Sequence, residues 1–224
     1  MSATTPSAIY RVNTNNGRVT QVALLDRSIV PKDITFVGNR LIGSTIGSRL
    51  FSYDFTNGKS SLFKNQLGFG VAPLEALVTQ ASTQKVFGAH RRGTFVEVNP
   101  NTGKGKKVGD MGLYSDGGLA FLNGVLYATV VRPKGTPNTH GSYLARVSMN
   151  TSTMGKATPV GPIRTVRNAK TTYHNRVQAL EVRNGVLYGA MYTGEILRIN
   201  SGNATATVLG DNQKFQNGLA TSPK

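Results

Sequence analysis

The protein has 224 residues, a length that suits one all-β domain of the larger kind with a substantial core. It contains no cysteine, which excludes a disulfide framework and thiolate chemistry. Lysine and arginine number 26 against 10 aspartates and glutamates, so the formal net charge is +16. Such a charge predicts acidic partners, namely nucleic acid, an acidic protein surface, an anionic membrane or a glycan.

The N-terminal residues show neither the charged nor the apolar segment of a signal peptide. No apolar run is long enough to cross a bilayer. From these two observations we expect a protein that is made in the cytoplasm and does not insert into a membrane.

Five short segments with β-type alternation recur along the chain. They are Ile9–Asn13, Leu50–Asp54, Phe95–Asn99, Tyr143–Ser148 and Ile196–Asn200. Their equivalent positions, from Val12 to Ile199, are separated by 41, 45, 49 and 52 residues. Four antiparallel strands at such a period are typical of one blade of a β-propeller.

The fourth repeat predicts all four strands of a blade, at Gly118–Leu122, Val125–Val131, Ser142–Ser148 and Ala157–Gly161. Asn-Gly between the first two strands is a strong hairpin signal, because a type I′ turn needs positive φ at both central positions. This dipeptide occurs at Asn123-Gly124 and again at Asn184-Gly185. Similar dipeptides predict the turn between the third and fourth strands, at Asn16-Gly17, Asn57-Gly58 and Thr102-Gly103.

The two ends of the chain predict one shared blade. Ser2–Asn13 aligns without a gap to Gly189–Asn200, so the chain starts at the second strand of a blade. Asn217–Thr221 matches the first strand, as in Gly117–Phe121. We therefore expect residues 1–224 to form a single five-bladed β-propeller, with four antiparallel strands per blade and a ring closed by N- and C-terminal strands.

Gly185–Tyr188 followed by Gly194–Asn200 resembles the repeats of many bacterial propellers and of strictosidine-synthase-like proteins. The resemblance implies a blade and not a function, because propellers host unrelated activities. Strictosidine-synthase-like proteins have six blades, whereas five repeats are counted here. The blade number and small size also resemble compact five-bladed lectins, which use tryptophan, and this chain contains none.

The loops that enter each first strand, and those that join the second and third strands, are expected to share one face. The two longest are Val160–Gln178 and Val131–Ser142, and long loops are often functional. These loops supply a basic set interleaved with tyrosine, which could bind phosphate or carboxylate or simply form a solvated charged face. The candidate binding residues are His90, Arg91, Arg92, Arg132, Arg164, Arg167, Lys170, Tyr173, His174 and Arg176.

The three histidines, His90, His140 and His174, lack the spacing of a metal site, so we expect neither metal nor cofactor. Asp33, Glu75 and Asp116 fall at or beside the start of the first strand in three successive repeats. They could bind backbone amides, hold a cation or ligand, or act as the catalytic carboxylates of a glycoside hydrolase.

From these features we expect a non-enzymatic binding or structural module, a basic disk that docks onto an acidic protein surface or other polyanion. The composition and charge would suit a virion component, attached to capsid or tail proteins. A lectin-like propeller that binds a glycan is the first alternative, and a five-bladed glycoside hydrolase is the second. A nucleic-acid binder is favoured by the charge, although no aromatic stacking motif is present.

Overall fold

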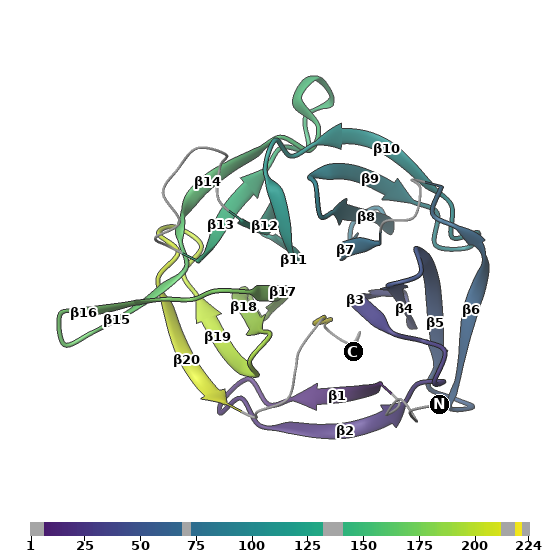
Figure 1. The fold of residues 1–224 in the computed structure, drawn as a ribbon, viewed down its shortest axis with the longest axis horizontal. Helices are drawn as coiled ribbons and strands as arrows, with labels where there is room; N and C mark the ends of the chain where they lie inside the picture. The colour runs from purple at the N-terminus through teal and green to yellow at the C-terminus, as the bar shows by residue number, and fades with distance from the viewer. Residues whose placement is uncertain (1–6, 69–72, 132–140, 212–217, 221–224) are drawn as a thin grey trace.

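The computed structural model describes residues 7–68, 73–131, 141–211 and 218–220 and shows an all-β protein. Within these residues, the regular elements are β-strands and one 3₁₀ turn, η1 (Thr151–Thr153). The sheets stand as blades around a central axis, which is the arrangement of a β-propeller (Figure 1). The predicted all-β propeller is therefore confirmed at this level.

Four of the sheets contain four antiparallel strands each, in chain order from the centre to the rim. The first two sheets comprise β3 (Pro31–Val37), β4 (Arg40–Thr45), β5 (Arg49–Asp54) and β6 (Lys59–Gln66), then β7 (Leu74–Gln80), β8 (Lys85–His90), β9 (Thr94–Val98) and β10 (Gly105–Asp110). The next two comprise β11 (Tyr114–Leu122), β12 (Val125–Val131), β13 (Ser142–Val147) and β14 (Ala157–Pro162), then β17 (Val177–Arg183), β18 (Val186–Met191), β19 (Glu195–Ile199) and β20 (Ala206–Asp211).

Two smaller sheets complete the fold. β1 (Ala8–Val12) pairs with β2 (Val19–Leu24), and this pair lies between the last and the first four-stranded sheets (Figure 1). β15 (Arg164–Arg167) pairs with β16 (Lys170–Tyr173) in a hairpin that projects outward from the rim (Figure 1). The four blades found differ from the five expected, because the N-terminal sheet has two strands among the described residues. Most residues predicted to complete it, in 1–6 and 217–221, lie outside the described residues.

The Asn-Gly turns have the predicted conformation. Asn123 and Gly124 have φ of 50° and 79°, and Asn184 and Gly185 have φ of 52° and 73°. Glycine adopts such angles without the Cβ clash that other residues suffer, and asparagine tolerates them better than most. These turns connect β11 to β12 and β17 to β18, as the sequence predicted.

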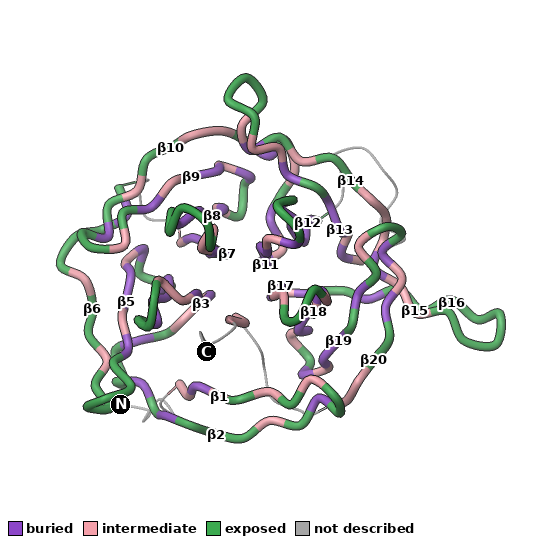
Figure 2. The backbone as a smooth tube through the Cα atoms, turned by 180° about the vertical axis from the view of Figure 1, so that it is seen from behind, coloured by how far each residue is buried: buried purple, intermediate pink, exposed green. Residues whose placement is uncertain are grey.

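The core lies between neighbouring sheets. One cluster of buried residues joins the second and third four-stranded sheets and includes Phe87, Phe95, Leu119 and Leu126. The four-stranded sheets thus bury apolar residues against their neighbours, while the turns and outer strands carry most of the exposed residues (Figure 2). Packing against two neighbours explains why the second strands, β4, β8, β12 and β18, are buried over most of their length.

The rim repeats one contact from sheet to sheet. The turn between the third and fourth strands contacts the outer strand of the preceding sheet. For example, the side chain of Asn65 in β6 donates to the carbonyl of Thr102, in the β9–β10 turn, at 2.8 Å. The β1–β2 turn makes the same contact, since a Cβ on Gly17 would lie 2.9 Å from the Gly210 Cα. The two-stranded sheet is therefore held at the rim as the larger sheets are.

The segment Gly218–Ala220 lies at the centre, beside β3. Leu219 packs against the buried Ala179, Ala190 and Ile196, and its backbone amide donates to the Asp33 carboxylate. This position next to β3 is the one expected of an innermost strand, although no strand is assigned there.

Candidate functional site

The basic residues predicted from the loops fall into two groups. His90, Arg91 and Arg92 lie at the turn from β8 to β9, where both arginines are exposed. Most of the others belong to the β15–β16 hairpin and the residues just after it. Arg132 and His140 lie outside the described residues.

Sequence analysis predicted a loop at Val160–Gln178 and missed the hairpin within it. Its strands pair in register, with Arg164 opposite Tyr173 and Arg167 opposite Lys170. The turn consists of Asn168 and Ala169, which have φ of 49° and 60°. Every residue from Val166 to Tyr173 is exposed, so the hairpin buries almost no apolar surface (Figure 2).

The base of the hairpin is fixed to the ring. Ile163 is fully buried, and the backbone amide of Arg164 donates to the Ala204 carbonyl of the next sheet at 3.2 Å. His174 is buried, and its Nε2 lies 2.7 Å from the Thr165 hydroxyl. Burial lowers the pKa of His174, which favours the neutral ring. His174 is therefore an anchor for the hairpin and not one of its exposed cations.

Carboxylates are missing from this part of the sequence. Between Asp116 and Glu181 the chain has eight lysines and arginines and no aspartate or glutamate. The ion pairs among the described residues lie elsewhere, between Lys32 and Glu75, Lys85 and Glu97, and Lys107 and Asp110. The positive charge of the hairpin is thus not neutralised by any described ion pair.

The three predicted carboxylates have different surroundings. Asp33 is buried and accepts from the backbone amides of Ile34 at 2.9 Å and Leu77 at 2.6 Å, besides that of Leu219. Burial raises the pKa of Asp33 well above its usual value, and these three donors oppose the shift. Glu75 pairs with Lys32 at 3.2 Å. Asp33 therefore links the centres of neighbouring sheets.

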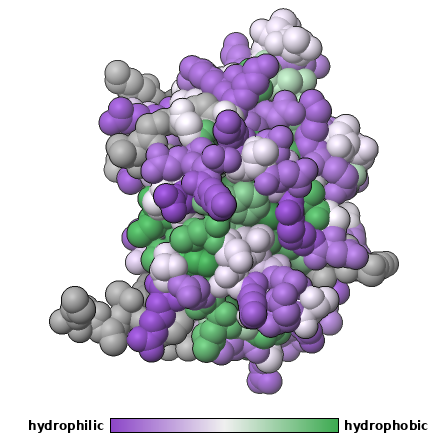
Figure 3. Space-filling model, turned by 90° about the vertical axis from the view of Figure 1, so that its right-hand side faces the viewer, coloured by the Kyte–Doolittle hydropathy of each residue, from purple (hydrophilic) through white to green (hydrophobic). Residues whose placement is uncertain are grey.

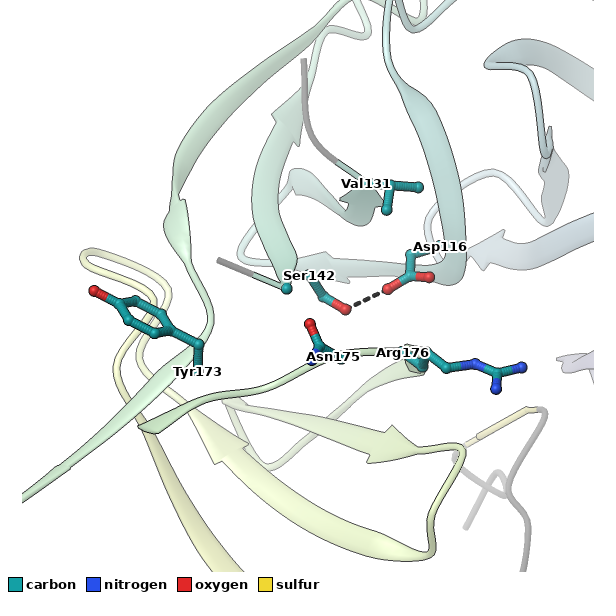
Figure 4. A pocket seen from close by; sticks show the side chains of 7 residues that line it. Asp116, Val131, Ser142, Tyr173, Asn175 and Arg176 are labelled. Atoms are coloured by element: carbon teal, nitrogen blue, oxygen red, sulfur yellow. Dashed lines mark hydrogen bonds between the residues drawn. The ribbon is translucent and has the colours of Figure 1, made fainter. Parts of the chain in front are cut away.

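Asp116 lines a pocket of about 380 Å³ beside the base of the hairpin. The Ser142 hydroxyl donates to its carboxylate and in turn accepts from the Val177 amide at 3.0 Å (Figure 4). In the same view the Arg176 side chain points away from this pair (Figure 4). Its guanidinium carbon lies 3.8 Å from the centre of the Tyr192 ring, a cation–π contact. Sequence analysis found Asp116 and Arg176 but not Ser142.

We expect Asp116→Asn to stabilise the protein at neutral pH. Burial raises the pKa of Asp116 from 3.8 to about 6, against the opposing effects of Ser142, Arg176, Val177 and Arg91. The native state then holds the proton more tightly than the unfolded state, so stability is lost as the pH rises through this range. Asparagine keeps an oxygen for the Ser142 hydroxyl and does not ionise.

Urea unfolding at pH 4 and pH 7 measures this effect. The variant should gain up to about 3 kcal/mol over the unmodified protein at pH 7 and little at pH 4. A variant that is less stable at pH 7 would contradict the assignment of a destabilised carboxylate.

The described residues contain no group of three or more His, Cys, Asp or Glu side chains placed to hold a metal ion. His90 has a buried Nε2 without a hydrogen-bond partner, while its Nδ1 accepts from the Arg92 amide at 3.3 Å. Burial lowers the pKa of His90, and the nearby Glu75 charge opposes this. One neutral histidine with a single free nitrogen offers no set of ligands.

The side of the ring seen in Figure 3 is mainly polar. On the side of the ring shown in Figure 3, hydrophilic residues cover most of the surface around a smaller hydrophobic area. Within the described ranges, no helix is both long and apolar enough to span a membrane.

No family model matches the chain, and no curated protein matches it in sequence. One similar solved structure is the extracellular domain of a protein assigned as a hybrid two-component system of B. thetaiotaomicron, with a TM-score of 0.48 and 14% identity over 91% of this chain and 25% of that chain. Another, from the same organism and assigned to a one-component system, has a TM-score of 0.47 and 13% identity over the same shares. The chain thus spans a quarter of the length of these solved chains.

Proposed function

We propose that the protein is a non-enzymatic binding module that docks through its basic surface onto an acidic partner, within a larger assembly such as a virion. The observation that carries the proposal is the exposed basic hairpin on the rim. It belongs to the part of the chain between Asp116 and Glu181, which contains eight lysines and arginines and no carboxylate. An exposed positive surface of this kind attracts polyanions and raises their rate of association.

The arrangement of the cations supports binding more than catalysis. Asp33 and Glu75 are already engaged with backbone amides and with Lys32, which leaves Asp116 as the carboxylate that lines the pocket. A glycoside hydrolase needs a pair of carboxylates across one cleft. The exposed hairpin, by contrast, needs no rearrangement to reach a partner.

We further propose that the scaffold is a closed ring of five blades. The β1–β2 sheet would be the outer half of the fifth blade, and the C-terminal segment its innermost strand. Support comes from the rim contacts on both sides of this sheet, including the Asp26 amide that donates to the Ser60 hydroxyl at 2.9 Å. The hydrogen bond from the Leu219 amide to Asp33 supports the placement of the C-terminal segment as the innermost strand. A closed ring leaves no open sheet face between the first and last blades.

Replacement of Arg91, Arg92 and Arg167 by glutamine tests the function. We expect affinity for heparin, used as a model polyanion, to fall at least tenfold and its salt dependence to become shallower, because fewer counterions are released. Arg164 is left in place, since its guanidinium donates to the carbonyls of Pro162 and Asn203 and contributes to the fold. Affinity is measured by fluorescence titration from low to physiological salt.

The matched control replaces three other exposed cations, Lys104, Lys106 and Arg183, with glutamine. It removes the same charge and should change heparin affinity far less. Equal losses in both variants would show that net charge alone drives binding. Salt-insensitive binding to a neutral glycan, unchanged in both variants, would instead favour the lectin-like alternative.

A further inference from the structure

The β15–β16 hairpin has two locally unfavourable features at its tip. Arg167 and Lys170 are direct cross-strand partners, and like charges in that position repel. Ala169 has φ of 60°, which costs about 1 kcal/mol or more for a residue with a Cβ. A short hairpin without a core has little stability to spare. Such local conflicts are typical of positions kept for binding.

The composition of the hairpin fits nucleic acid better than an acidic protein. Besides Arg164, Arg167 and Lys170 it contains three threonines and an asparagine, all able to donate hydrogen bonds, with one valine, one alanine, one tyrosine and no acidic residue. Protein–protein interfaces are enriched in aromatic residues, methionine and arginine, and depleted in lysine and in carboxylates. Protein–DNA interfaces are more polar and far more positive.

The shape of the hairpin favours duplex DNA over duplex RNA. A ribbon of two strands about 4.8 Å apart, with its side chains, fits the B-DNA major groove, which is about 12 Å wide and admits a two-stranded ribbon. The major groove of A-form RNA is deep and narrow and excludes side chains. Ile163 and His174 fix the base of the ribbon, so the base loses little conformational freedom when the hairpin binds.

We propose that the β15–β16 hairpin enters the major groove of duplex DNA, where Arg167 and Lys170 contact phosphates on either side. This inference rests on the proposed function and names the polyanion that the basic surface binds. Polar groups of the hairpin, such as Asn168, would then lie near the edges of the bases.

The test compares a 20-base-pair DNA duplex, the RNA duplex of the same sequence and polyglutamate by fluorescence anisotropy at several salt concentrations. The unmodified protein should bind DNA at least tenfold more tightly than RNA, although the two carry equal charge. The double variant R167Q/K170Q should bind DNA at least tenfold more weakly, and its slope of log K against log salt should fall by about 2. The control K104Q/K106Q removes the same charge from the β9–β10 region, and its affinity for DNA should stay within about twofold of that of the unmodified protein.

A third variant, Ala169→Gly, keeps both cations and relieves the turn, so it should retain DNA binding and show no loss of thermal stability. Equal weakening in the two charge variants, or equal affinity for DNA and RNA, would overturn the hairpin inference and leave polyanion docking standing. Binding to polyglutamate but to neither duplex would also overturn the hairpin inference and leave polyanion docking standing. Failure to bind DNA, RNA, polyglutamate and heparin would overturn the proposed function as well.

Discussion

Deletion of residues 217–224 is expected to lower the free energy of unfolding by more than about 3 kcal/mol and to reduce the soluble yield. The deletion removes Leu219, which packs against buried residues of β17, β18 and β19, and Ala220, which packs on the cluster around Leu25 and Phe51. It also removes a backbone donor from the buried Asp33 carboxylate. The apolar surface exposed in this way would lie between two sheets, where association with other chains is favoured.

Two variants separate ring closure from a general effect of shortening the chain. Deletion of residues 222–224 keeps Gly218–Ala220 and should leave the melting temperature close to that of the full chain. Leu219→Ala removes one packed side chain and should give an intermediate loss. Thermal unfolding and size-exclusion chromatography measure both properties. An unchanged melting temperature after deletion of 217–224 would contradict the closed ring.

The repeat and its turns could be predicted from sequence because their signals are local. An Asn-Gly pair between two apolar runs requires positive φ at two positions, and the structure has that conformation at Asn123-Gly124 and Asn184-Gly185. The alternating runs around Val98, Val147 and Ile199 became the third strands of their sheets, and these three residues are buried there. Among the described residues, four complete blades are found and not five, since β1 and β2 stand there in a sheet of two strands.

The hairpin could not be predicted in the same way. Its strands are exposed on both faces, so they lack the alternation that burial imposes. Its turn, Asn168-Ala169, lacks the glycine of the Asn123-Gly124 and Asn184-Gly185 turns. The position of the basic residues could be predicted, but their presentation on a projecting ribbon depends on backbone pairing and on the anchor at His174. Sequence spacing carries no signal for either.

The surroundings of Asp33 depend on tertiary packing in a similar way. Its location at the start of an innermost strand was predicted, and β3 does begin at Pro31. The sequence did not decide whether its carboxylate binds backbone amides, holds a cation or ligand, or acts in catalysis. The amide of Leu77 comes from β7, 44 residues away along the chain, and approaches because two sheets pack at the centre. A prediction from local sequence cannot include that partner.

Asp33→Ala is expected to lower the free energy of unfolding by roughly 3 kcal/mol or more, because it leaves the buried amides of Ile34, Leu77 and Leu219 without their acceptor. An unsatisfied buried donor costs about 1–3 kcal/mol. Burial of the carboxylate raises its pKa and is itself unfavourable, and the variant no longer bears this cost. The net loss of stability is therefore smaller than the summed cost of three unsatisfied amides. Urea unfolding of the two proteins at pH 7 measures the difference.

Two further substitutions show whether this loss belongs to the acceptor role of Asp33. Asp33→Asn retains one acceptor oxygen and relieves the burial of charge, so it should lose less than Asp33→Ala. Glu75→Gln removes a partly exposed ion pair with Lys32 and should cost less than about 1 kcal/mol, since such pairs contribute little. A catalytic carboxylate behaves in the opposite way, because its removal abolishes activity and often leaves stability unchanged or higher. An Asp33→Ala protein as stable as the unmodified chain would therefore refute the structural role and return Asp33 to the candidates for catalysis.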